Sequence, residues 1–220
     1  MPTGREQAPR QSTERTTSER RRVARRGAGA KSAERRRSIV EAAHAVFAER
    51  GYHAGSFQEI ADRVGMSQTG LLHYFPTKSD LLLAVLHRRD EITVDAAPAP
   101  EAAPEPAGLI QGIVDRARAN ESLPGVIELY AVLCAESITE GHPARSYFVG
   151  RFAGIRTAYA AELRALQAEG RVRPGIDPDR AAASLVGLWD GLQVQWLLEP
   201  ERVDVAACLR DYLELLLEPS

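Results

Sequence analysis

The chain has 220 residues, with 28 Lys and Arg, 30 Asp and Glu and two cysteines. A chain of this length can bury a core without disulfides or metals, and its distant cysteines, Cys134 and Cys208, fit buried thiols in a reducing, cytoplasmic location. There is no run of about 18 apolar residues and no metal-ligand spacing among the five histidines, so we expect no membrane span, metal or cofactor.

Charge divides along the chain. Residues 1–93 hold 17 Lys and Arg against 11 Asp and Glu, a net charge of +6, whereas residues 94–220 hold 11 against 19, a net charge of −8. The basic half favours binding to a polyanion. Uneven solvated charge with no binding role is the alternative.

The first 31 residues combine Ser, Thr, Gln, Pro and Gly with eight arginines and a lysine and have almost no large apolar side chain. Such a segment buries too little apolar surface to offset the entropy lost on ordering. We therefore expect residues 1–31 to be a disordered basic tail. It could follow DNA phosphates or enter a minor groove, or it could serve only solubility.

A helix, a sharp turn and a second helix are predicted next. Apolar side chains recur at helical spacing up to Gly51, which is placed to end the first helix of this region. Ser56 and Glu59 are spaced as a capping box, in which the hydroxyl accepts from the Glu59 amide while the carboxylate reaches back. Gly65 can supply the left-handed residue of a turn, and Ser67 can cap the following helix. The result is a helix-turn-helix.

The second helix of this motif begins with polar residues that can read DNA. Gln68 can bond an adenine edge through both amide atoms, and Thr69 can place its methyl group against thymine. Pro76 then breaks the chain, and Thr77 with Asp80 repeats the capping-box spacing to begin another helix. DNA binding is the leading functional prediction.

The stretch over residues 64–78, followed by Asp-Leu-Leu from residue 80, resembles the signature of TetR-family transcriptional regulators. The resemblance covers about residues 35–90. It implies an all-α protein, in which an N-terminal three-helix helix-turn-helix DNA-binding domain is joined to a C-terminal helical ligand-binding and dimerisation domain. Leu72 departs from the pattern, because the family most often has an aromatic residue there.

The resemblance also implies a partner and a set of contacts. Members of the family are dimeric and mostly repressors, so it implies a palindromic operator in double-stranded DNA and release by a small-molecule effector. For His73, packing beneath Tyr74 is the alternative to a base contact. The residues implied to face the major groove are Gln68, Thr69, Gly70 and His73, and those implied to line the phosphate backbone are Ser56, Phe57, Ser67, Tyr74 and Lys78.

Four prolines alternate with Ala and Glu over residues 98–106, which predicts an extended connector. We place the boundary there, between a DNA-binding domain over residues 32–93 and an effector-binding and dimerisation domain over residues 107–220. The later domain is predicted to be helical throughout. Its expected helices lie near residue 110, after a start at residues 122–124, over residues 143–169, and over about residues 178–198 and 204–217.

The last two of these helices carry apolar side chains on more than one face. In a domain of this size they cannot all be interior, so the simplest cover is the same helix pair from a second copy. This predicts a homodimer built as a four-helix bundle. A hairpin buried within a monomer is the alternative.

Six residues of the later domain are candidates for the effector pocket because they mix aromatic surface with occasional polar atoms on inward-facing helices. Apolar walls would suit a largely hydrophobic effector. Core packing is the alternative for each of them. The candidates are Tyr130, Cys134, Phe148, Phe152, Trp189 and Gln193.

Three other functions remain open on the sequence. An enzyme with Cys134 as nucleophile and His142 as base would lack every accompanying catalytic motif, so we expect no catalytic residues. The helix-turn-helix could also be a packing motif in an all-helical protein-interaction module. An activator would use the same DNA-binding motif as a repressor.

Overall fold

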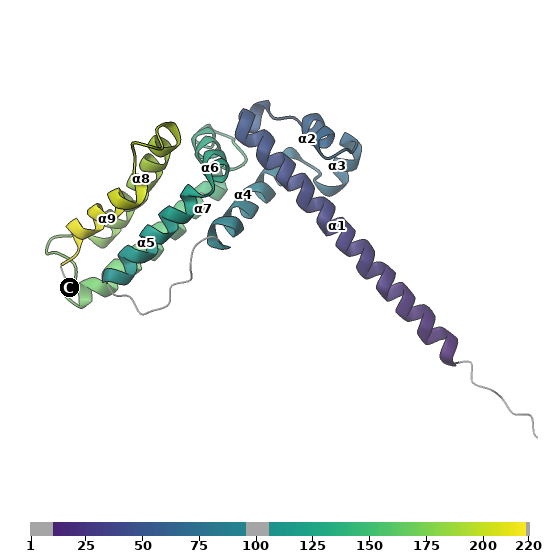
Figure 1. Cartoon of the computed structure of the whole chain (residues 1–220), viewed down its shortest axis with the longest axis horizontal. Helices are drawn as coiled ribbons and strands as arrows, with labels where there is room; N and C mark the ends of the chain where they lie inside the picture. The colour runs from purple at the N-terminus through teal and green to yellow at the C-terminus, as the bar shows by residue number, and fades with distance from the viewer. Residues whose placement is uncertain (1–10, 96–105, 219–220) are drawn as a thin grey trace, which may run out of the picture.

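The computed structural model describes residues 11–95 and 106–218, which are almost entirely helical (Figure 1). No strand occurs in these residues, where a single isolated bridge joins Val172 to Leu217. The expected all-α fold is confirmed. The helices of the described residues are α1 (Gln11–Ala54), α2 (Phe57–Arg63), α3 (Gln68–Tyr74), α4 (Lys78–Asp95), α5 (Pro106–Glu121), α6 (Pro124–Glu136), α7 (Arg145–Ala168), α8 (Pro178–Leu198) and α9 (Val205–Leu216).

Helix α1 begins much earlier than the sequence analysis placed it. It starts at Gln11, and Figure 1 shows its N-terminal part projecting away from the other helices. Residues 11–31 are therefore helical in the structure, where we expected disorder, and residues 1–10 lie outside the described residues. Arg and Ala have high helix propensity, so this segment can extend a helix whose later turns are fixed by packing.

Local signals at helix ends account for most of the boundaries. Gly51 interrupts α1 with a φ of 71°, and Gly65 and Gly170 adopt φ values of 65° and 71° after α2 and α7. Asp177 and Asp204 cap α8 and α9 by accepting from backbone amides three residues on, at 2.9 Å in both cases. These caps satisfy amides that have no partner within the helix.

Two hydrophobic cores hold the helices together. The N-terminal core joins α1–α4, with Phe47 and Phe75 among its largest buried side chains. It also takes in Leu129 and Leu133 of α6 and Phe148 of α7. The C-terminal core joins α5, the later part of α7, α8 and α9.

The two cores do not divide at the proline-rich connector, most of which lies outside the described residues. Helix α6 and the first turns of α7 follow the connector in sequence but pack against α1 and α4. A displacement of α6 would therefore be felt directly by the helices that carry the helix-turn-helix. None of the described helices is long and apolar enough to cross a membrane.

Candidate nucleic-acid interface and ligand cavity

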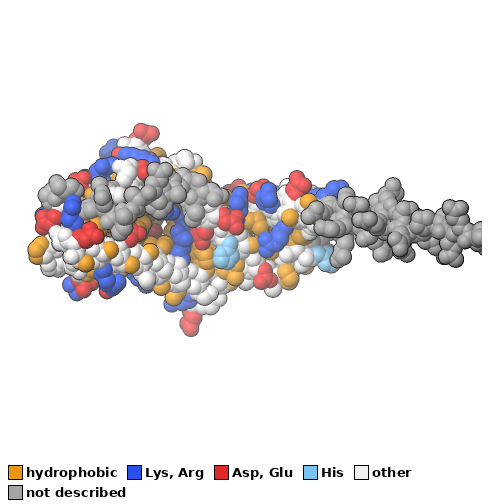
Figure 2. Space-filling model, turned by 90° about the horizontal axis from the view of Figure 1, so that it is seen from below, with side chains coloured by type: hydrophobic (Ala, Val, Ile, Leu, Met, Phe, Trp, Pro, Cys, Tyr) orange, Lys and Arg blue, Asp and Glu red, His pale blue; other side chains and the backbone are white. Residues whose placement is uncertain are grey.

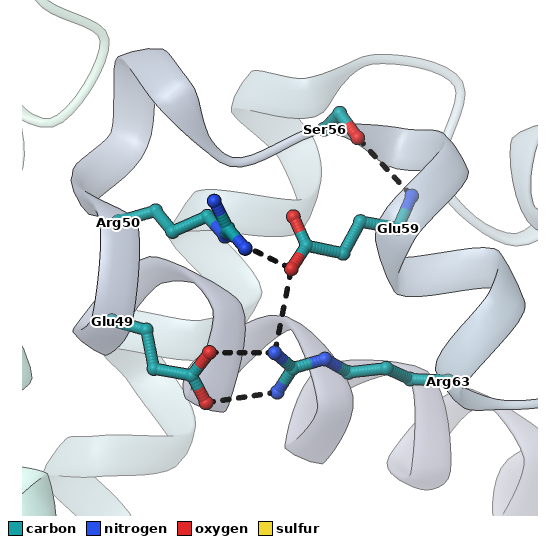
Figure 3. A network of polar contacts seen from close by, with 5 residues as sticks. All are labelled: Glu49, Arg50, Ser56, Glu59 and Arg63. Carbon is teal, nitrogen blue, oxygen red and sulfur yellow. Dashed lines mark hydrogen bonds and ion pairs between the residues drawn. The ribbon is translucent and has the colours of Figure 1, made fainter.

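Helix α2 begins with a side-chain cap and is fixed to α1 by a network of charged side chains (Figure 3). Ser56 Oγ accepts from the amide of Glu59 at 3.1 Å, as expected. The Glu59 carboxylate does not return to the cap: it accepts from Arg50 Nε at 3.0 Å and lies 3.4 Å from Arg63 Nη2. Arg63 also donates twice to Glu49, at 3.0 and 2.6 Å. Bonds to two guanidinium groups are stronger than a bond to a neutral amide, which explains the departure from a reciprocal capping box.

Helix α3 is anchored by one buried side chain and one cap. Leu71 is fully buried, and Ser67 Oγ accepts from the amide of Gly70 at 3.1 Å. A β-carbon at Gly70 would lie 3.3 Å from Ser67 Oγ and 3.2 Å from Met66 Cε. Glycine at this position therefore leaves room for the cap and for the turn before it.

The opposite face of α3 is open to solvent. Gln68, Thr69, Leu72 and His73 are all exposed, and their spacing places them on one side of the helix. His73 is thus not packed beneath Tyr74. Leu72, 39% exposed, belongs to this face, although the sequence analysis gave it no contact. We refer to these four residues as the α3 face.

The residues implied to contact phosphates have mixed surroundings. The Ser56 and Ser67 hydroxyls serve as helix caps, and Phe57 and Tyr74 are half-buried against the N-terminal core. Lys78 turns back toward the end of α1, where its Nζ donates to the carbonyl of His53 at 3.2 Å. Partial burial lowers the Lys78 pKa.

The basic excess of the first 93 residues lies at the start of the chain. Residues 1–31 hold nine Lys and Arg against three Asp and Glu, which accounts for the whole excess of the first 93 residues. On the face shown in Figure 2, blue and red side chains of the described residues are interspersed, with no single field of one sign. Nearer the motif, Arg35 donates to the carbonyl of Val64 at 3.3 Å, and the Arg36 guanidinium lies 4.5 Å from the Phe75 ring centroid.

Glu136, at the end of α6, connects the later helices to the end of α1. Its Oε2 accepts from the backbone amide of Tyr52 at 2.7 Å, directly after the left-handed Gly51. His142 Nε2 lies 4.0 Å from the same oxygen, and desolvation lowers the His142 pKa. We call this contact the α6–α1 link.

Replacing Glu136 with Ala is expected to lower the free energy of unfolding by about 2 kcal/mol, because the partly buried Tyr52 amide loses a charged acceptor. Urea denaturation followed by circular dichroism would measure the change. Glu128→Ala is the matched control, because Glu128 is an exposed residue of the same helix. An equal loss in both variants would show that the α6–α1 link has no special role.

A cavity of about 320 Å³ opens between α4, α5, α6, α7 and α8. Its wall combines six charged side chains with apolar and aromatic ones. The lining residues are Arg89, Asp90, Thr93, Arg116, Asn120, Tyr130, Arg151, Ile155, Ala158, Tyr159, Glu162, Val186, Trp189, Asp190 and Gln193.

The structure divides the six pocket candidates into two groups. Three lie on the cavity wall, and three do not, because they pack in or against the N-terminal core between α6, α7 and α4. An aromatic stripe alone cannot distinguish these two surroundings. The wall group is Tyr130, Trp189 and Gln193, and the core group is Cys134, Phe148 and Phe152.

The thiols do not have the properties of a catalytic site. Burial raises the Cys134 pKa to about 11, whereas a nucleophilic cysteine needs a lowered pKa. Cys208 is exposed on α9, contrary to our expectation of a buried thiol. Within the described ranges, His, Cys, Asp and Glu form no group of three or more that could hold a metal ion.

At one end of the cavity two arginines surround a single carboxylate. Asp90 Oδ1 accepts from Arg151 Nη1 at 2.7 Å and from Arg89 Nη1 at 3.2 Å, and its Oδ2 accepts from the Tyr147 hydroxyl at 2.7 Å. Both guanidinium groups lie over the Tyr130 ring, with Cζ atoms 4.1 Å (Arg89) and 5.4 Å (Arg151) from its centroid. Desolvation and the neighbouring Arg151 lower the Arg89 pKa.

The sequence contained a signal for these two arginines that we did not use. Arg89 continues the buried stripe of α4 that runs through Leu82, Val85 and Leu86, and Arg151 interrupts the apolar stripe of α7. A charged residue at a core position of an amphipathic helix indicates a buried ion pair or a ligand site. The structure shows the ion pairs, which both arginines form with Asp90.

Family models match both the helix-turn-helix region and the later helices of the chain. The model "Bacterial regulatory proteins, tetR family" matches residues 39–85, and the model "BetI-type transcriptional repressor, C-terminal" matches residues 128–218. The activator FasR of Mycolicibacterium smegmatis is 51% identical over 55 residues, 25% of each chain. The regulator PksA of Bacillus subtilis is 27% identical over 173 residues, 77% of this chain and 82% of its own.

A solved structure is similar over most of the chain. It is a transcriptional regulator from Saccharomonospora viridis in complex with choline, with 26% identity and a TM-score of 0.69, covering 85% of this chain and all of that one. Both the helix-turn-helix and the later helices therefore have counterparts in one group of regulators. The chain belongs to the TetR family of transcriptional regulators.

Proposed function

We propose that the chain is a repressor that binds a palindromic operator as a homodimer and leaves the DNA when a small molecule occupies the cavity. The observation that carries the proposal is the α3 face. A helix too short to be stable alone is held by Leu71 and by the Ser67 cap, so its polar side chains are presented in a fixed orientation. A preoriented helix of this kind fits the major groove.

Each residue of the α3 face suits a base contact. Gln68 can pair with adenine, and Thr69 and Leu72 offer apolar groups to a thymine methyl. His73 can donate to a base acceptor. Two copies of this face, about one helical turn or roughly 34–36 Å apart, would read the two half-sites of a palindrome.

Exposed apolar side chains on the last two helices support a homodimer. Val194 and Leu198 of α8 are 46% and 77% exposed, and Leu215 of α9 is 67% exposed. Exposed apolar surface on adjacent packed helices indicates a protein interface. Because the same surface on a second copy is self-complementary about a two-fold axis, we propose dimerisation through α8 and α9.

Two helices connect the cavity to the helix-turn-helix. Helix α4 carries Lys78 at its start and Arg89 on the cavity wall, about 16 Å further along the helix axis. Helix α6 carries Tyr130 on the same wall and Glu136 at the α6–α1 link. A ligand that shifts either helix would change the separation of the two α3 faces and so weaken DNA binding. Bound DNA would then weaken ligand binding by the same factor.

The relatives support two parts of this proposal. The regulator from Saccharomonospora viridis is described in complex with choline, which favours a ligand site within the helical domain. The later helices match a model of BetI-type repressors, which favours repression. FasR is described as an activator, so activation is the second candidate. Transcription from the chain's own promoter in a purified system would distinguish repression from activation, because a repressor lowers the transcript level and an activator raises it.

Substituting Gln68 with Ala is expected to weaken operator binding by about tenfold or more, since a good bidentate base contact contributes about 1–3 kcal/mol. Fluorescence anisotropy with a labelled promoter duplex would measure the change in Kd. Gln111→Ala is the matched control, because Gln111 is an exposed glutamine on α5 and its side chain bonds only within that helix.

The same titrations test the alternative of a protein-interaction module. A DNA-binding protein loses affinity steeply as salt rises, because bound phosphates release counterions. Unchanged binding in Gln68→Ala, or no binding of the wild-type protein even at low salt, would remove the α3 face as the DNA-contacting surface.

A further inference from the structure

The two arginines at the end of the cavity carry more hydrogen-bond donors than their bonded partner accepts. Arg89 is 3% exposed, and its guanidinium and that of Arg151 both donate to the same oxygen of Asp90. Asp90 also accepts from the Tyr147 hydroxyl, so its acceptor capacity is largely used. A further acceptor beside the two guanidinium groups would complete their hydrogen bonds.

Several buried polar atoms of the cavity wall have no partner among the described residues. These are the Nε atoms of Arg89 and Arg151 and the Oδ1 atom of Asn120, a residue that is 7% exposed. Buried polar groups in native proteins are nearly always hydrogen-bonded, and exceptions indicate a function or a missing partner. Here the unpaired atoms gather around one cavity from α4, α5 and α7.

The remaining carboxylate at this end, Asp190, accepts no hydrogen bond from the described residues. Desolvation raises its pKa to about 6, although Arg151 and Arg89 act in the opposite direction. A carboxyl group of this kind takes up a proton readily when a second anion arrives, and it can then donate to that anion. Asp190 is therefore compatible with an anionic ligand.

A quaternary ammonium ion is a poor match for the same end. Such cations bind over open aromatic faces, and the Arg89 guanidinium already occupies the face of Tyr130 at 4.1 Å. A further cation beside the buried Arg89 and the half-buried Arg151 would also be repelled by both.

We propose that the cavity binds an organic carboxylate, whose anionic group lies against Arg89 and Arg151 and whose apolar body lies against Trp189, Ile155 and Val186. The proposal rests on the proposed function of the cavity as the effector site. Trp189 is 8% exposed and forms a large apolar surface beside the charged end. The cavity of about 320 Å³ suits a small molecule with one charged end.

The test compares three compounds of one shape on the full chain, without DNA: phenylpropionate, phenylpropanol and phenylpropylamine. Isothermal titration calorimetry is expected to give a Kd for the carboxylate about tenfold or more below that of the alcohol, with the amine weakest, because charge-assisted bonds to arginine are available only to the carboxylate. Equal binding of the three, preference for the amine, or no binding of the carboxylate at millimolar concentration would each overturn the proposal.

A pair of variants locates the carboxylate. Arg151→Gln is expected to weaken phenylpropionate about tenfold and to leave phenylpropanol within about twofold, because only the charged contact is lost. Arg156→Gln removes an exposed arginine of the same helix and is expected to leave both unchanged. Equal effects of the two substitutions would contradict the assignment. If Arg151→Gln does not fold, the three-compound series on the wild-type protein still tests whether the cavity prefers a carboxylate.

These measurements separate this proposal from the proposed function. A protein that binds its operator but shows no preference for the carboxylate keeps the DNA-binding function and loses this inference. Conversely, a protein that selects the carboxylate but does not bind DNA keeps the ligand class and loses the regulatory function.

Discussion

Replacing Leu198 with Glu is expected to convert the dimer into monomers and to weaken operator binding by about two to four orders of magnitude. Leu198 is 77% exposed at the end of α8, on the face proposed to meet a second copy. A carboxylate placed there would be desolvated without a partner on association, which opposes dimer formation strongly. The monomer would then bind one half-site without the high local concentration that the first contact gives the second.

Sedimentation velocity would measure the oligomeric state, and fluorescence anisotropy the operator affinity. Ile138→Glu is the matched control: Ile138 is 76% exposed but follows α6 and belongs to neither α8 nor α9. It is expected to leave the dimer intact. A Leu198→Glu protein that stays dimeric would move the interface elsewhere, and one that is monomeric but binds the operator normally would contradict the two-half-site arrangement.

The DNA-binding motif could be predicted from the sequence because its signals are local. The caps of α2, α3 and α4 depend on residues three apart, and all three are present in the structure. The left-handed turn at Gly65 is likewise a property of a single residue. Such features do not depend on how distant helices pack.

The cavity could not be predicted in the same way, because five helices build its wall. Tyr130 and Trp189 face it, whereas Phe148, which is equally aromatic and inward-facing, packs between α6 and α4 instead. The difference arises from how α6 and α7 are shared between the two cores, and helical periodicity does not specify that sharing. The ion pair of Arg151 with Asp90 joins residues about 60 positions apart, which a single sequence cannot pair.

Helices α4 and α6 join the cavity to the helices of the DNA-binding motif. Helix α4 joins them directly, and α6 provides a second path through its packing on α1 and the α6–α1 link. If Glu136→Ala weakens this path, a ligand would bind with similar affinity but displace less DNA, because coupling requires contacts that differ between the two states. Stability and coupling can thus be measured on the same variant.

Replacing Asp190 with Asn is expected to stabilise the free protein at neutral and higher pH and to leave its stability unchanged near pH 4. Burial raises the Asp190 pKa to about 6, well above the ordinary value for an aspartate. The folded state therefore binds this proton more tightly than the unfolded state. The contribution of Asp190 to wild-type stability falls as pH rises from about 4 through about 6, and that loss is complete above this range.

Asparagine keeps the size of the side chain but carries no charge, so the variant is expected to lack this loss. A shift of about two pKa units corresponds to at most about 3 kcal/mol, and access of water to the cavity reduces the expected gain to about 1–2 kcal/mol at pH 7. Urea denaturation at a series of pH values would measure it. Asp211→Asn is the control, because Asp211 is exposed on α9.

A gain that is equal at all pH values would show that the effect of Asn is not electrostatic, and no gain at pH 7 would show that Asp190 is well solvated. A gain confined to the higher pH range has a further meaning. It would show that the protein retains a carboxylate at a cost to its own stability, beside two arginines that it does not bond. Residues retained at such a cost are typical of ligand sites, where function opposes maximal stability.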